Sequence, residues 1–125
     1  MIRLTKEHIL LMQEQLINRY GGSHGIRDEG MLDSALSAPF QGFAGVDFYP
    51  TITSKAVRLS YGLIMNHPFI DGNKRIGALA LLTMLDLNHI EINMSSKELE
   101  DTILSVASGQ LSDDGYLRWV QEHTA

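Results

Sequence analysis

Hydrophobic residues recur along this chain at intervals of three and four positions, which is the spacing of amphipathic helices. Capping and breaking residues separate the periodic segments, among them Thr5, Gly21–Gly22, Pro39 and the pair Ser95 and Glu98. The helices are expected at about 5–20, 28–38, 54–66, 74–87 and 95–108, with a last one from 112 onward. The pattern therefore predicts an all-α fold, a single-domain compact helical bundle of about six helices over residues 1–125.

One segment differs from the others, because residues 74–87 are apolar on nearly every side of the expected helix. Such a helix is typical of the centre of a bundle. Asn88 is expected to end it in the left-handed conformation. The first helix should turn inward the face that carries Ile9, Met12, Leu16 and Tyr20. Trp119, alone near the C-terminus, is interpreted as a packing residue.

Residues 40–52 show no helical period, and they contain four aromatic side chains, which is unusual for a connecting segment. The rings belong to Phe40, Phe43, Phe48 and Tyr49. They indicate a plug for the edge of the core.

Composition narrows the function classes. The chain has 125 residues, 44% of them hydrophobic and 20% charged, as in ordinary globular proteins. Ten basic and fifteen acidic residues give a net charge of −5, which argues against direct nucleic-acid binding driven by charge. The absence of cysteine excludes disulfides and thiolate zinc sites and suits a reducing cytosol. We expect a cytoplasmic protein with no membrane span and no signal peptide.

The densest chemistry lies in the stretch His67–Arg75, with the sequence HPFIDGNKR. Pro68 disfavours helical dihedrals at the preceding residue, so one helix should end near Asn66. Gly72 and the asparagine after it suit a tight turn into the next helix. The unpaired N–H groups at the start of that helix, with two cations beside them, predict a site for anionic oxygens such as phosphate.

Within this stretch each residue type suits one task in phosphoryl transfer. The imidazole of His67, with an ordinary pKa of about 6.5, suits proton abstraction from an attacking hydroxyl. Asp71 offers a hard oxygen ligand for Mg²⁺, and Gly72 lets a phosphate approach the backbone. Lys74 brings a compact charge, and Arg75 brings a planar fork. An ordinary turn with solvated cations is the alternative interpretation, although that charge placement opposes the helix dipole.

The motif HPFIDGNKR resembles the signature loop of the Fic/Doc superfamily, and in particular of the death-on-curing (Doc) toxins of bacterial toxin–antitoxin modules. The segment Arg19–Gly22 and the chain length are also similar to those of Doc toxins. The pattern of Fic adenylyltransferases is HPFx(D/E)GNGRxxR, and this chain departs from it twice. Lys74 replaces a glycine, and Ala78 replaces the last arginine. The lysine variant implies a kinase that delivers the γ-phosphate of ATP.

By this resemblance His67 is the general base, Asp71 holds Mg²⁺, and the phosphates lie on Gly72, Asn73, Lys74 and Arg75. The implied acceptor is a Ser or Thr hydroxyl of a translation factor, elongation factor Tu. A flap before the third helix, at residues 40–52, is expected to cover the active site and dock the target chain. Alternatives are a nucleotidyltransferase that attaches AMP, and a non-catalytic module that binds an anion or a partner.

The resemblance also bears on control. The self-inhibitory pattern (S/T)xxxE(G/N) is not matched, because the nearest segment, Ser96–Glu100, is followed by Asp101. Control is therefore expected from a cognate antitoxin, whose disordered segment folds into a helix on this bundle.

Overall fold

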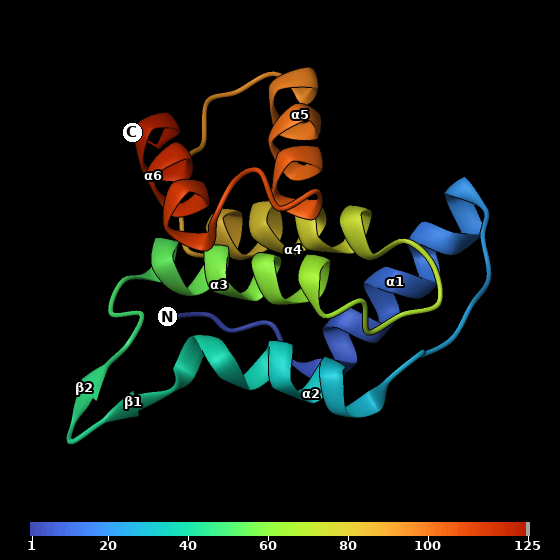
Figure 1. The fold of residues 1–125 in the computed structure, drawn as a ribbon, viewed down its shortest axis with the longest axis horizontal. Helices are drawn as coiled ribbons and strands as arrows, with labels where there is room; N and C mark the ends of the chain where they lie inside the picture. Colours follow the sequence, from blue (N-terminus) through green and yellow to red (C-terminus); the bar gives the residue numbers. More distant parts are fainter. Residues whose placement is uncertain (125) are drawn as a thin grey trace.

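The structure, a computed structural model, describes residues 1–124 and is an all-α bundle (Figure 1). Its helices are α1 (Lys6–Tyr20), α2 (Glu29–Ser37), α3 (Ile52–Met65), α4 (Asn73–Leu87), α5 (Ser96–Ala107) and α6 (Asp113–His123). A short 3₁₀ turn, η1 (Ala38–Phe40), and a hairpin of two strands, β1 (Gly42–Phe43) and β2 (Val46–Asp47), lie between α2 and α3. The predicted all-α bundle and its helices are confirmed, with ends that agree to within about two residues.

Local capping explains most of these boundaries. Thr5 and Ser95 each accept a hydrogen bond from the third residue of the helix, whose side chain bonds back to the cap. The expectation for Asn88 is wrong, because its φ is −102° and His89 takes the left-handed conformation at 60°. The Asn88 side chain instead binds the backbone N–H and carbonyl of Ile2, at 2.7 and 2.8 Å, and so fastens the N-terminal segment to α4.

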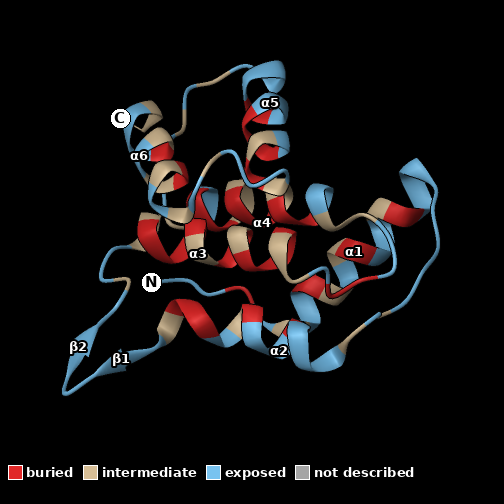
Figure 2. Ribbon diagram, in the orientation of Figure 1, coloured by how far each residue is buried: buried red, intermediate tan, exposed pale blue. Residues whose placement is uncertain are grey.

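Helices α3 and α4 lie side by side at the centre of the bundle, and nine of the 14 residues of α3 and six of the 15 residues of α4 are buried (Figures 1 and 2). The central position expected for residues 74–87 is confirmed. The two helices approach closely at Gly77, where a Cβ atom would lie only 2.5 Å from Cγ1 of Ile64. Beside this contact, the Ser60 hydroxyl donates to the Gly77 carbonyl (2.7 Å) and bonds to the hydroxyl of Tyr116 (2.8 Å). Burial raises the pKa of Tyr116, so α6 docks through a neutral hydroxyl.

The inward face of α1 is rotated by one residue from the expected one. Its buried residues are Ile9, Gln13 and Ile17, whereas Tyr20 is 54% exposed. Gln13 turns inward because its amide donates to the backbone carbonyl of Asp71, in the connection between α3 and α4. A hydrophobic pattern does not reveal this contact, because the buried residue is polar. Trp119 is half-buried and stacks on His123, as expected for a packing residue.

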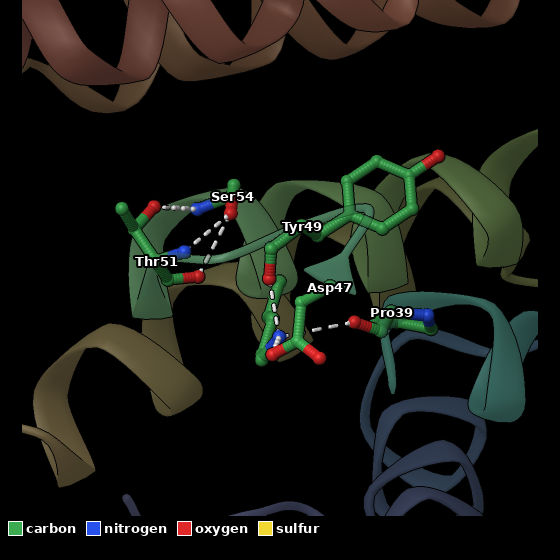
Figure 3. A network of polar contacts seen from close by, with 6 residues as sticks. Pro39, Asp47, Tyr49, Thr51 and Ser54 are labelled. Carbon is green, nitrogen blue, oxygen red and sulfur yellow. Dashed lines mark hydrogen bonds and ion pairs between the residues drawn. The ribbon is translucent and has the colours of Figure 1, made fainter. Parts of the chain in front are cut away.

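The hairpin before α3 projects from the bundle (Figure 1). The interpretation of its rings as a core plug is wrong for Phe43 and Phe48, which are 78% and 59% exposed; Phe40 alone packs against the core, partly buried. The base of the hairpin, at Asp47 and Tyr49 (Figure 3), is held by Lys55 of α3, a buried lysine. Its ammonium donates to the carbonyl of Tyr49 and forms an ion pair with Asp47 (3.3 Å).

No helix within residues 1–124 is long and apolar enough to cross a membrane.

Candidate active site

The connection between α3 and α4, residues 66–72, forms one side of a cavity of about 670 Å³. We call this connection the motif loop. Every residue for which the sequence predicted a role lines the cavity, namely His67, Asp71, Gly72, Asn73, Lys74 and Arg75. Ala78, one turn further along α4, also lines it. The structure therefore brings the predicted base, metal ligand and phosphate-binding residues together at one site.

The N-terminus of α4 is open toward a ligand. Gly72 occupies the N-cap position with a φ of 79°, and no side chain caps the helix. The first backbone hydrogen bond runs from the N–H of Ile76 to the carbonyl of Gly72 (2.9 Å). The three N–H groups between these residues have no partner inside the helix. These N–H groups and the exposed side chains of Lys74 and Arg75 are the groups from which the sequence predicts an anion site.

Asn73 shapes the loop with its side chain rather than offering that side chain to a ligand. Its carbonyl oxygen accepts from the N–H of Phe69 (3.0 Å), and its amide donates to the carbonyl of the same residue (3.0 Å). Its backbone N–H, in the first turn of α4, has no partner inside the helix.

A second segment, residues 22–28, pairs with the motif loop, and no pattern in the sequence predicts this pairing. Ile26 forms an isolated antiparallel bridge with Phe69, and the N–H of Ile70 donates to the carbonyl of Gly25 (3.1 Å). The carbonyl of Pro68 accepts from the N–H groups of residues 27 and 28, at 2.7 and 3.1 Å. Residues 22–28 therefore lie directly against the motif loop.

The flap expected over the site is at another place. Residues 40–52 precede α3, whereas the motif loop follows it, and Figure 1 shows the hairpin and the loop at opposite ends of this helix. A 14-residue helix is about 21 Å long, so the hairpin does not cover the cavity, and none of its residues lines it. The order of elements along the chain already implies this separation, because the third helix lies between the two segments.

His67 is held in a sparsely populated conformation. Its φ is 47°, left-handed rather than extended, and its side chain is exposed at the cavity. Arg27 secures this turn, because its Nε donates to the carbonyl of His67 (2.6 Å) and its Nη2 to the carbonyl of Asn66 (2.9 Å). A non-glycine residue at positive φ persists only where its surroundings fix it, and here one guanidinium does so.

Asp71 is positioned from two directions. The N–H of Ser23 donates to its Oδ2 (2.6 Å), while Gln13 binds its backbone carbonyl. Gly22 leaves room for this approach, since a Cβ atom there would lie 3.2 Å from Cβ of Asp71. No cluster of three or more potential metal ligands occurs within residues 1–124. A single exposed carboxylate beside an anion site suits Mg²⁺, which takes its remaining ligands from phosphates and water.

The segment Arg19–Gly22, at the end of α1, reaches the same site. The Arg75 guanidinium lies over the ring of Tyr20, 4.7 Å from its centre, and Arg19 lies over the same ring at 5.4 Å. This contact explains why Tyr20 stays exposed: its ring supports a cation at the rim of the cavity.

The opposite wall of the cavity comes from α5 and was not predicted. Its residues recur at helical spacing along one stripe, and they are Ser96, Leu99, Glu100, Ile103 and Leu104. The segment that most nearly matches a self-inhibitory pattern thus faces the motif loop. The helical period could have indicated the stripe, but not the element that it faces.

Comparison with known proteins agrees with this geometry. The family model described as Fic/DOC family matches residues 3–85. A curated relative named Toxin Doc, from Mycolicibacterium smegmatis, is 36% identical over 91 residues, which are 71% of this chain and 70% of the relative. Another, named Protein kinase doc, from Escherichia phage P1, is 25% identical over 112 residues, 90% of this chain and 87% of the relative. The chain belongs to the Fic/DOC family.

Proposed function

We propose that this protein is the toxin of a toxin–antitoxin module and acts as a protein kinase. It transfers the γ-phosphate of ATP to a Ser or Thr hydroxyl of a translation factor, elongation factor Tu, and thereby arrests translation and growth. The names of the two relatives, a toxin and a protein kinase, support this proposal. The observation that carries it is the single cavity shared by an exposed imidazole, a carboxylate and an uncapped helix N-terminus.

The chain's own residues divide the work. His67 takes the proton from the attacking hydroxyl, because it is the only imidazole in the cavity lining. The open first turn of α4, Lys74 and Arg75 hold the phosphates. Asp71 would hold Mg²⁺, which would neutralise part of the charge of the phosphates. Lys74 fills the place where adenylyltransferases carry glycine, and this favours phosphate over AMP as the transferred group.

Intact-mass analysis tests the reaction. Purified elongation factor Tu is incubated with the protein, ATP and Mg²⁺, and a gain of about 80 Da per acceptor is expected for phosphate. A gain of about 329 Da would replace this proposal with AMP transfer. No gain in mass would leave the elongation factor without support as the target, and the same reaction in a whole lysate would then show whether another protein is modified.

We also propose a cognate antitoxin as a partner, with a disordered segment that folds on this bundle. Growth arrest by the protein is expected to be relieved by co-expression of the neighbouring gene product. Persistent arrest would contradict this partner.

A further inference from the structure

The cavity beside the motif loop has two walls of different chemistry. The motif-loop wall carries two cations, the carboxylate of Asp71 assigned to Mg²⁺, and the open end of α4. The α5 wall carries no basic residue, and its stripe combines a hydroxyl, three aliphatic side chains and the carboxylate of Glu100. This wall also lies beyond residues 3–85, the part of the chain that matches the family model.

We propose that Glu100 recognises the nucleoside end of the nucleotide, by accepting hydrogen bonds from the ribose hydroxyls or the amino group of the base. This inference rests on the proposed function, because it requires a nucleotide in the cavity. It names the part of the nucleotide that α5 binds and the residue that selects it.

The charges of the two walls fix which end of the ligand lies where. A triphosphate is attracted by Lys74, Arg75 and the α4 N-terminus, and it is repelled by the carboxylate of Glu100. The reverse orientation would place the phosphates against a wall without a cation and leave the phosphate site empty. The nucleoside therefore lies on the α5 side.

The α5 wall also has the right surface for a nucleoside. Leu99 and Ile103 are buried at its base, and Leu104 is half-exposed at its edge, so they offer an apolar shelf for a base or ribose face. The cavity volume of about 670 Å³ is in the range that accommodates a molecule of this size. Glu100 is exposed beside this shelf, and none of the ion pairs within residues 1–124 involves it. Its oxygens are thus open to donors on the ligand.

The carboxylate of Glu100 has two opposing effects on nucleotide binding: it repels the phosphates, and it accepts a hydrogen bond from the nucleoside. The distances over which these two effects act determine which of them is larger. Repulsion of the phosphates acts across the cavity and is reduced by solvent, by salt and by the cations of the motif-loop wall. A hydrogen bond to a charged acceptor acts at contact distance and is among the stronger ones in proteins. Removal of Glu100 is therefore expected to weaken nucleotide binding.

Calorimetric titration with Mg²⁺ present separates the two ends of the ligand. The probes are ATP, 2′-deoxy-ATP, 3′-deoxy-ATP, purine riboside triphosphate, which lacks the amino group, and inorganic triphosphate. Glu100→Met is expected to lose affinity for ATP about tenfold and to bind inorganic triphosphate within about twofold of the unaltered protein. Among the three ATP analogues, the one whose affinity Glu100→Met does not change lacks the donor that Glu100 recognises.

The matched control is Asp101→Leu, which removes one charge from the neighbouring position, where the carboxylate pairs with Lys97 outside the cavity lining. It is expected to bind ATP within about twofold of the unaltered protein. Equal or tighter ATP binding by Glu100→Met would overturn the inference while the proposed function stands. An unaltered protein that binds neither ATP nor inorganic triphosphate would overturn the proposed function itself, and the inference with it.

Discussion

The motif loop and the β1–β2 hairpin lie at opposite ends of α3 and are held in different ways (Figure 1). The motif loop forms hydrogen bonds with α1, with residues 22–28 and with the side chain of Asn73 at the start of α4. The hairpin is fastened at its base, where Lys55 binds it, while Phe43 and Val46 near its tip are exposed. Side chains that act together at a site need such support from several elements to keep their geometry. The aromatic residues of the hairpin do not by themselves indicate either a supported structure or a functional site.

The largest effect is expected at the exposed imidazole of the motif loop. His67→Ala should lower the rate of transfer about 100-fold or more, because it removes the proposed base. Its unfolding free energy should change by less than about 0.5 kcal/mol, since the side chain is exposed. Rates from intact-mass time courses and urea midpoints check both expectations. His89→Ala, also exposed and at positive φ, is the control. Retention of more than about a tenth of the rate would remove His67 from the role of base.

The hairpin base should respond in stability. Lys55→Met keeps the length of the side chain but leaves the carbonyl of Tyr49 without its donor, at an expected cost of about 2 kcal/mol of unfolding free energy. Lys97→Met removes a solvent-exposed ion pair with Asp101 and should change it by less than about 0.5 kcal/mol. Urea denaturation compares the two variants. Equal values would show that Lys55 does not anchor the hairpin.

Arg27 tests whether the fixed conformation of the motif loop matters for activity. Arg27→Ala should lower the transfer rate about tenfold, because the turn at His67 loses both of its guanidinium hydrogen bonds. Arg27→Lys should not restore the rate, since an ammonium lacks the fork. Arg118→Ala, on the exposed face of α6, serves as the control. A rate equal to that of the control would mean that the loop keeps its geometry without Arg27.

The smallest effect is expected at the hairpin tip. Phe43→Ser should change the unfolding free energy by less than about 0.5 kcal/mol, because its ring is 78% exposed. Thermal or urea unfolding measures this. A loss of more than about 1 kcal/mol would show that the ring packs in solution and would weaken the contrast between the two regions.

The nature of the site was evident from local sequence. Nine consecutive residues hold the imidazole, the carboxylate, the glycine of the N-cap and both cations, and the helix start that follows them leaves N–H groups free. These features depend on residues that are close in the chain, so the rules of residue spacing and helix capping can predict them. The same reasoning placed the helices, because each is bounded by its own caps and breakers.

The residues that support the site come from segments distant in the chain, and rules of local sequence cannot predict their contacts. Gln13, Ser23 and Arg27 meet the motif loop from 40 to 58 residues away in the chain. They are ordinary polar residues until the fold brings a carbonyl or carboxylate to them, and only the structure separates them from other surface polar groups. The α5 wall belongs to the same class, since its stripe could be predicted but its partner could not.

By itself, the sequence determined which chemical groups stand together in the motif HPFIDGNKR and where the helices begin and end, because both depend on interactions within a few residues. The tertiary structure decided how these helices pack, and with that it decided two further matters. It placed residues 22–28 against the motif loop, and it brought Glu100 into the same cavity as Lys74 and Arg75. The physical reason is that contacts between distant segments depend on the packing of all helices at once, which no local pattern encodes.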